Sequence, residues 1–340
     1  MRKVFALTAV IALLGLGIAA QAVTIATVPV GNAGNAGELS GSGAGGYGPD
    51  RICGSVGYNY NIGKYEVTAG QYTDFLNAKA TVSDPYGLYS TGMSNTSYGS
   101  GITQTWASGS YTYSVASAFV NRPVNFVSYW DSCRFANWLG NGQGAGSTET
   151  GAYTLNGYNG MDGRTIQRNA NWKWAVTSED EWYKAAYYKG GGTTSGYWDY
   201  PTSSNTAPGQ DMTDASGNNA NYWTGSGAYP IDSGKYTTVA GEFQNSDSPY
   251  GTFDQGGNVW EWNEAIVYQD VNYGYRGLRG GAFYSVNYDY LQASGRNYDY
   301  PTDEYYLIGF RVSQVVPEPS SIMALAGGLI SLLCIRRRMV

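Results

Sequence analysis

FDQGGNVWEWNE, which spans Phe253 to Glu264, gathers two glycines, two tryptophans and several carboxylates in one short stretch. Asp254 and Glu261 offer hard oxygen ligands, and the Gly256–Gly257 pair lets the backbone turn so that carbonyl oxygens face one centre. A turn of this kind suits calcium, which takes about 6–8 oxygen ligands. A glycine turn that leads into a core strand, with both acids in solvent, accounts for the stretch equally well. The residues alone leave both interpretations open.

The composition of the chain restricts its chemistry. Its 340 residues suffice for one large domain or two small ones, and they include 48 glycines, 32 tyrosines and 10 tryptophans but no histidine. The absence of histidine excludes histidine-based catalytic triads, imidazole acid–base catalysis, and zinc or iron sites held by histidine. Any metal would therefore be bound by oxygen atoms or by very few sulfur atoms.

Three cysteines are present, at Cys53, Cys133 and Cys334. Cys334 lies in an apolar tail, which leaves Cys53 and Cys133 as candidates for a disulfide in an oxidising compartment. Cys133 also falls in a predicted amphipathic helix, where a buried free thiol is as well accommodated. The sequence decides neither case.

The N-terminal end has the features of a secretory signal peptide. Arg2 and Lys3 precede the apolar run Val4–Ala20, and the sequence Ala20-Gln21-Ala22 provides a site for signal peptidase. We therefore expect residues 1–22 to be removed, with a retained membrane anchor as the alternative. Residues 23–50 are mostly Gly, Ala, Asn and Ser, and we predict that they form a flexible leader.

The C-terminal end, residues 316–340, has three parts in a fixed order. Pro317-Glu318-Pro319 is followed by the apolar run Ile322–Ile335 and by the Arg336–Arg338 cluster. The apolar run is shorter than the roughly 17–25 residues that span a bilayer. The order resembles the PEP-CTERM sorting signal, which implies transient anchoring, cleavage by an exosortase-type enzyme, and delivery to the outer cell surface or its exopolysaccharide matrix. A plain C-terminal anchor is the alternative.

Removal of both ends makes an acidic chain more acidic. The whole sequence carries a formal net charge of −6, and the two ends hold more basic than acidic residues. An acidic body argues against a nucleic-acid partner, because binding to phosphates depends on Lys and Arg. It is compatible with the binding of cations.

Between these ends, the pattern of caps and apolar positions predicts three helices joined by short strands and long loops. The helices are expected to begin after Thr68, Ser128 and Ser178. In the third helix, Glu179 and Glu181 suggest a catalytic carboxylate pair, but residues at i and i+2 do not face each other on a helix. We therefore interpret them as first-turn charges that stabilise the helix N-terminus.

Six motifs occur in an order that identifies a family resemblance. They are Lys64–Thr68, Asn121–Asn125, Thr177–Trp182, Gly257–Trp262, Arg279–Gly281 and Gly309–Arg311. In this combination, residues 51–315 resemble the formylglycine-generating enzymes, the sulfatase-modifying factor family. The resemblance implies a single, loop-rich α+β domain that is related to C-type lectins and stabilised by calcium.

The resemblance also implies one or two structural Ca²⁺ ions. Ligands of the first would be the side chains of Asp254 and Glu261 and the carbonyls of Gln255, Gly257 and Val259. Ligands of the second would be the side chains of Asn221 and Asp232 and the carbonyls of Tyr222 and Gly234.

The oxidative chemistry of the family does not transfer to this chain. Formylglycine-generating members bind copper through two cysteines that follow Arg-Gly-Gly, and the corresponding positions here are Ser285 and Tyr290. Copper(I) needs soft ligands, and related members that use iron hold it with histidines. We therefore expect no copper, iron or zinc and assign no catalytic residue.

The segment that carries the substrate groove in the family is instead rich in tyrosine. Tyr, Asn and Ser are common in adaptable binding surfaces. The predicted ligand-binding surface comprises Ser285, Asn287, Tyr288, Tyr290, Arg296, Tyr298 and Tyr300. Cross-strand packing of these tyrosines is the alternative.

Three functions remain open from the sequence. The first is an exported, non-catalytic, calcium-stabilised binding or structural module whose ligand is a polysaccharide or a surface protein. The second is an enzyme, either an oxidoreductase of the formylglycine-generating type with relocated ligands, such as Cys53 and Cys133, or a hydrolase that uses carboxylates. The third is an inert domain that serves as a spacer for its sorting tail.

Overall fold

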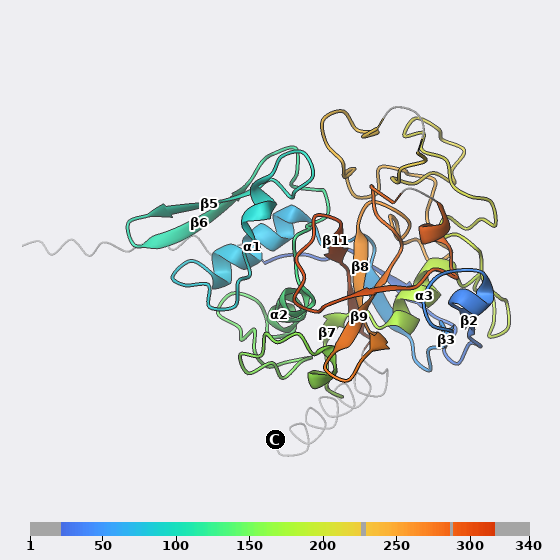
Figure 1. Ribbon diagram of the computed structural model, residues 1–340, viewed down its shortest axis with the longest axis horizontal. Helices are drawn as coiled ribbons and strands as arrows, with labels where there is room; N and C mark the ends of the chain where they lie inside the picture. Colours follow the sequence, from blue (N-terminus) through green and yellow to red (C-terminus); the bar gives the residue numbers. More distant parts are fainter. Residues whose placement is uncertain (1–21, 226–228, 286–287, 317–340) are drawn as a thin grey trace, which may run out of the picture.

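The computed structural model describes residues 22–225, 229–285 and 288–316 (Figure 1). The expected signal peptide up to residue 21, the sorting tail from residue 317 and Asn287 lie outside the described residues. Within the described residues, no helix is long and apolar enough to cross a membrane.

Three α-helices form in the described chain, in agreement with the sequence prediction. They are α1 (Ala69–Lys79), α2 (Tyr129–Gly140) and α3 (Glu179–Tyr187). Each begins with a capping box, in which the side chain of the cap residue and that of the third helical residue bond to each other's backbone N–H groups. Local sequence thus determines where each helix begins.

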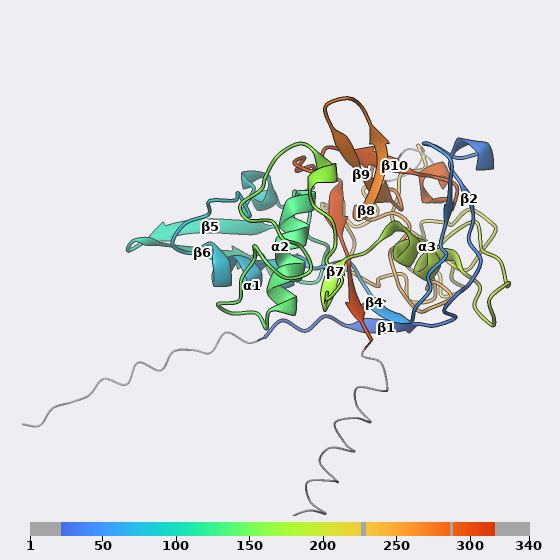
Figure 2. The ribbon, with the colours of Figure 1, turned by 90° about the horizontal axis from the view of Figure 1, so that it is seen from below.

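Two four-stranded sheets form the centre of the molecule (Figures 1 and 2). The first has the order β1 (Thr27–Val30), β4 (Tyr60–Gly63), β12 (Val312–Val315) and β7 (Trp174–Val176). The second has the order β10 (Asn297–Asp299), β9 (Gly274–Arg279), β8 (Trp260–Gln269) and β11 (Ile308–Phe310). All pairings are antiparallel except that of β11 with β8, which is parallel.

Two further strand pairs and four short 3₁₀-helices complete the described secondary structure. The pairs are β2 (Glu38–Ser40) with β3 (Arg51–Cys53), and β5 (Ile102–Ala107) with β6 (Ser110–Val115). The 3₁₀-helices are η1 (Ser42–Ala44), η2 (Thr91–Ser94), η3 (Gly163–Thr165) and η4 (Tyr288–Leu291). The β5–β6 pair is an antiparallel hairpin.

The main core is built largely from aromatic side chains. Phe135 and Trp138 of α2 both pack against Phe75 of α1. Phe135 also packs against Phe310 of β11. Trp262 of β8 is fully buried and donates its indole N–H to the Val127 carbonyl at 2.9 Å. Aromatic side chains thus supply apolar area while their polar tips find partners.

The prediction of a flexible leader at residues 23–50 is wrong. β1 pairs with β4 at the edge of the first sheet, and β2 pairs with β3 beside α3 (Figure 2). Val30 is only 1% exposed, and the buried Asn35 amide donates to the Gly54 carbonyl at 2.8 Å. Backbone pairing and small side chains hold this segment in place, so its low content of large apolar residues gave a misleading signal.

Candidate binding site

The stretch from Phe253 to Glu264 forms a tight loop that leads into β8. Asp254 and Asn258 adopt left-handed backbone conformations with φ of 59° and 58°. At Gly257, φ is 84°, and a Cβ atom would lie 2.3 Å from the Asn221 carbonyl oxygen. Glycine is therefore required at this position both by conformation and by space. The loop brings the 221 region against the start of β8.

Glu261 lies at the start of β8 and is fully buried. It accepts two hydrogen bonds from Arg311, from Nε and Nη2, each at 2.7 Å, and one from the Trp182 indole N–H at 2.7 Å. This bidentate ion pair links β8 to the segment between β11 and β12. The carboxylate thus has three charge-assisted or indole contacts within the protein itself.

The other predicted ligands of the first calcium site lie in the same loop. The Gln255 side-chain amide donates to the Trp182 carbonyl at 3.0 Å and accepts a bond from Thr252. Gly257 donates its N–H to the Gly280 carbonyl at 2.8 Å, and Val259 is fully buried. Asp254 accepts a hydrogen bond from the Gly241 N–H at 2.6 Å. Calcium coordination by this set stays a prediction.

Glu66 is a further buried group beside this loop, and the sequence analysis does not select it. Its Oε1 atom accepts a hydrogen bond from the Asn258 side chain at 3.1 Å, and its Oε2 atom has no partner among the described residues. Burial, and then the charge of Asp254, raise the pKa of Glu66 well above its usual value. Burial also raises the pKa of Asp254 to about 6. Carboxylates therefore outnumber guanidinium groups at this loop, where Arg311 pairs with Glu261.

The four residues assigned to the second calcium site are placed in different surroundings. Asp232 forms an ion pair with Arg122, and the Tyr222 carbonyl accepts a bond from the Gln210 amide. Gly234 adopts a φ of 77° in the turn that follows Asp232. The assignment of these residues to a calcium site stays a prediction.

Asn221 is the member of that set with unused capacity. Its side-chain N–H₂ donates to the Asn258 side-chain oxygen at 3.1 Å and to the Tyr236 carbonyl at 2.8 Å. Its Oδ1 atom is buried without a partner in the part of the chain that the structure describes. A buried acceptor without a partner is costly, and a cation would satisfy it.

The donor set around the loop fits a cation that prefers oxygen. Within the described ranges there is no group of three or more His, Cys, Asp or Glu side chains that would hold a metal ion. A site at this loop would therefore combine two carboxylates with amide and carbonyl oxygens, which is a donor set that calcium accepts. The partnerless Oε2 atom of Glu66 is the observation that favours such an ion.

The two positions that correspond to the family's cysteines lie side by side. Both flank Gly281, since the Ser285 hydroxyl and the Tyr290 Cβ are 3.3 and 3.2 Å from the position that a Cβ of Gly281 would take. The Ser285 hydroxyl accepts a hydrogen bond from the Ala282 N–H at 2.8 Å. The Tyr290 ring stacks on Tyr47, with the ring centroids 5.0 Å apart.

The remaining members of the predicted ligand-binding surface are dispersed. Tyr298 stacks on Tyr268 with centroids 5.2 Å apart, and the Tyr300 and Tyr275 hydroxyls are 2.7 Å apart. These contacts are the cross-strand packing that was the alternative for the tyrosines. Tyr288 contacts the Tyr200 ring edge-on, with its own side chain 43% exposed.

Arg296 is only 4% exposed and binds Glu179 through two hydrogen bonds of 2.7 and 2.8 Å. Its guanidinium group belongs to a buried ion network, which corrects its assignment to the ligand-binding surface. Sequence reasoning placed Arg296 by its neighbours in a tyrosine-rich segment, and its pairing with a residue more than one hundred positions away was not visible.

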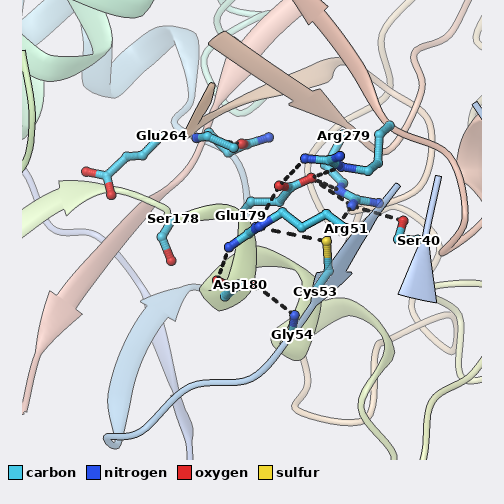
Figure 3. Close-up of polar contacts among 12 residues, drawn as sticks. Ser40, Arg51, Cys53, Gly54, Ser178, Glu179, Asp180, Glu264 and Arg279 are labelled. Carbon is cyan, nitrogen blue, oxygen red and sulfur yellow. Dashed lines mark hydrogen bonds and ion pairs between the residues drawn. The ribbon is translucent and has the colours of Figure 1, made fainter. Parts of the chain in front are cut away.

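The buried ion network is centred on Glu179 at the N-terminus of α3 (Figure 3). Its carboxylate contacts Arg51, Arg279 and Arg296, each at a shortest distance of 2.7 Å. Burial opposes ionisation, but the three guanidinium groups outweigh it and lower the pKa of Glu179 to about 2. The network links β3, β9 and α3 through ion pairs, which indicates a role in holding the fold together.

Cys53 and Cys133 are both buried and free, so they do not form a disulfide. The Cys53 sulfur lies 3.3 Å from Nη2 of Arg279, at the edge of the Glu179 network (Figure 3). Cys133 lies on α2 in the main core, whereas Cys53 belongs to a separate cluster around α3. Burial raises the pKa of the Cys53 thiol to about 11, which disfavours the thiolate that binds metals.

An aromatic pocket opens beside the segment that contains Ser285. It has a volume of about 430 Å³, and its lining residues come from five separate parts of the chain. They are Tyr98, Phe126, Tyr236, Phe283, Tyr284 and Tyr306. The predicted ligand-binding surface includes none of these six residues, although Ser285 directly follows Tyr284 in the sequence. The prediction missed them because no local pattern marks residues that meet only in the fold.

The backbone of the pocket wall is held in an uncommon conformation. Phe126 has a φ of 56°, which is rare for a bulky side chain. The neighbouring Asn125 is fully buried, and its amide N–H₂ donates to the carbonyls of Tyr98 at 2.7 Å and Tyr306 at 2.5 Å. One buried side chain therefore ties together three segments that each contribute a ring to the pocket.

Comparisons with known proteins agree with the motifs. A model of the sulfatase-modifying factor enzyme 1-like domain matches residues 51–315, and a model of the PEP-CTERM protein-sorting motif matches residues 315–338. No curated protein matches the chain. The sorting motif marks an exported protein that exosortase-type machinery recognises at the membrane and sorts to the cell surface.

Solved structures confirm the predicted fold class. The crystal structure of CarF is 18% identical with a TM-score of 0.52, and the match covers 86% of this chain and 99% of that one. Treponema denticola variable protein 1 is 19% identical with a TM-score of 0.50, and the match covers 87% of this chain and 96% of that one. At these identities the likeness shows the fold alone. Together with the family match, it leads to one conclusion: the chain belongs to the sulfatase-modifying factor enzyme 1-like family.

Proposed function

We propose that this protein is a non-catalytic, calcium-stabilised binding module of the cell surface or exopolysaccharide matrix. The observation that carries the proposal is the aromatic pocket, whose lining residue Tyr284 directly precedes Ser285, one of the two positions where the family's oxidases have cysteines. Among the described residues, the pocket is lined by six aromatic side chains, four of which are tyrosines. A pocket of this kind recognises a ligand by its shape and apolar faces and offers no reactive group.

The neighbouring residues support binding over oxidation. Ser285 and Tyr290 stand side by side as the cysteines would, but a hydroxyl and a phenol are poor ligands for copper(I). The two cysteines that a relocated copper site would need lie in different clusters of the core. The geometry near the pocket therefore favours a ligand that is held and not transformed.

The chemistry of the pocket suits a polysaccharide. Tyrosine and phenylalanine rings pack against the apolar C–H faces of sugar rings, while phenol groups exchange hydrogen bonds with sugar hydroxyls. A volume of about 430 Å³ falls within the range of small-molecule sites. The sorting motif is compatible with the same ligand class, because it directs the protein to the cell surface, where we propose that the polysaccharide lies.

An array of glycans and peptides, followed by calorimetry on the best ligand, tests the proposal. Tyr284→Ala and Tyr306→Ala should each weaken binding by about tenfold or more, since one lost aromatic contact at a binding site is worth about 1–3 kcal/mol. Tyr284 is 43% exposed, so its replacement should leave the fold intact.

Trp106→Ala is the matched control, because Trp106 is an exposed aromatic residue on β5 that does not line the pocket. Its replacement should leave affinity unchanged. Equal affinity in the wild-type protein and both tyrosine variants would refute the pocket as the binding site. Formation of formylglycine on a cysteine peptide, with copper and oxygen supplied, would refute the non-catalytic assignment.

A further inference from the structure

The loop at the start of β8 contains more buried acidic groups than basic ones. Glu66 and Glu261 are the buried acids, and Arg311 is the buried base. Asp254 is half-buried and lies on the segment that pairs with the one carrying Glu66. Glu66 and Glu261 are 2% and 0% exposed. A buried carboxylate without a compensating charge is costly, so the excess acid at this loop requires an explanation.

Arg311 cannot compensate all three carboxylates, because its donors are already used. Nε and Nη2 bind Glu261, Nη1 donates to the Gly63 carbonyl at 2.9 Å, and Nη2 also donates to the Phe253 carbonyl at 2.9 Å. The pair between Arg311 and Glu261 is therefore electrically neutral and internally satisfied. It leaves Glu66 and Asp254 without a direct cationic partner among the described residues.

The backbone places Glu66 and Asp254 next to each other. The Phe253 N–H donates to the Lys64 carbonyl at 2.9 Å, which aligns the segment before Asp254 with the segment before Glu66. The ring of Tyr65 also contacts that of Phe253, with centroids 5.8 Å apart. These contacts fix the two carboxylates on neighbouring segments of one rigid region.

Two buried acceptor atoms near this pair have no hydrogen-bond donor among the described residues. Oε2 of Glu66 has no partner, and neither has Oδ1 of Asn221, within the described chain. The Asn258 side chain lies between them, donating to Glu66 and accepting from Asn221. Each of these acceptors lacks a donor or a cation. Because the two lie on opposite sides of the Asn258 amide, we assign only the Oε2 atom of Glu66 to the site beside Asp254.

We propose that Glu66 and Asp254 bind a divalent cation at this loop, and that Glu66 takes the place assigned to Glu261 by family resemblance. Calcium is the ion that best suits two carboxylates supported by amide and backbone oxygens. Glu261 serves instead to fix Arg311 and Trp182. The inference rests on the calcium part of the proposed function and is independent of the aromatic pocket.

Calorimetric titration of calcium into the purified, EDTA-treated protein tests the inference, with terbium luminescence as a second measure of occupancy. Glu66→Gln should weaken calcium binding by at least about tenfold, and Asp254→Asn should do the same. Glu261→Gln is the matched comparison, because it removes one carboxylate charge from the same loop. It should lower the thermal stability of the cation-free protein yet retain the calcium-induced rise in melting temperature.

Each outcome has a defined meaning. Loss of binding in Glu261→Gln with full binding in Glu66→Gln would overturn the inference and leave calcium stabilisation in place. Absence of calcium and terbium binding in the wild-type protein would overturn both, while leaving ligand binding by the aromatic pocket to its own test. If Glu66→Gln does not fold, Asp254→Asn decides, because unchanged calcium affinity in that variant would also refute the site.

Discussion

Two buried carboxylate centres in this protein differ in how their charge is balanced. At the N-terminus of α3, Glu179 contacts Arg51 and Arg279 (Figure 3). It also contacts Arg296. At the start of β8, Glu66 has one amide contact on one oxygen and no partner on the other within the described residues. The first centre is complete in the protein alone, whereas the second has unused acceptors.

The difference separates a structural role from a binding role. Three guanidinium groups around one carboxylate lower the free energy of the folded state only while all four groups remain together. A cation that binds a carboxylate with an unused oxygen lowers the free energy of the folded state. The Glu179 centre should therefore respond to mutation and to acid, and the Glu66 centre should respond to calcium.

The largest effect is expected from Glu179→Gln. The replacement keeps the shape of the side chain but leaves three buried or partly buried guanidinium groups without their shared counterion. We expect a loss of about 3–5 kcal/mol in the free energy of unfolding, measured by urea denaturation. Asp180→Asn, on the same helix turn, should cost far less, because Asp180 contacts Arg51 alone among the arginines and its side chain is 25% exposed. Equal losses in the two variants would contradict the assigned centre.

The second prediction concerns acid. The pKa of Glu179 is lowered from 4.5 to about 2 in the folded protein, although burial alone would raise it. A lowered folded-state pKa means that the stabilisation is complete above pH 4.5 and is lost as the pH falls toward about 2. The loss should be on the order of 3 kcal/mol, seen in urea unfolding across that range. Glu179→Gln should show a flatter acid limb, and an unchanged limb would contradict the prediction.

Removal of calcium should have the third-largest effect. A ligand that binds only the folded state stabilises it by about 2.7 kcal/mol when present at 100 times its dissociation constant. We expect EDTA to lower the melting temperature of the wild-type protein and calcium to restore it, measured by scanning calorimetry. The same increment should appear in Asp180→Asn, because sites without shared contacts act additively. If calcium no longer raised the melting temperature of Asp180→Asn, the two centres would be energetically coupled, which would contradict the prediction.

Sequence reasoning reached the features that local chemistry specifies. Thr68, Ser128 and Ser178 each mark a helix start, because a cap and its partner three residues later are neighbours in sequence. The turn at Gly256–Gly257 was located for the same reason. The family motifs then supplied the fold class, which no composition or periodicity had decided.

Features that depend on distant partners were missed. The sequence predicts a flexible leader where β1 forms, because the residues that pair with β1 lie some distance along the chain in β4. Glu179 was interpreted as a first-turn charge, since Arg279 and Arg296 are 100 and 117 residues away. Glu66 lay inside a recognised motif, yet its unused oxygen became visible only when Asp254 and Asn258 were placed beside it.

The smallest predicted effect compares the helix caps that lie next to Glu179 and Glu66 in the sequence. Ser178 caps α3 directly before Glu179, and Thr68 caps α1 two residues after Glu66. Ser178→Ala and Thr68→Ala should each cost about 1 kcal/mol of unfolding free energy, because each leaves one helix N–H without its acceptor. The two costs should differ in their response to calcium.

The cost of Ser178→Ala should be the same with calcium and with EDTA, because α3 leads into the centre that is complete without a cation. Thr68→Ala shifts the end of the segment that carries Glu66, so its cost should be larger when calcium is bound than when it is removed. Urea unfolding of both variants in the two buffers measures the difference. A calcium-dependent cost for Ser178→Ala, or a calcium-independent one for Thr68→Ala, would place the cation elsewhere than at Glu66.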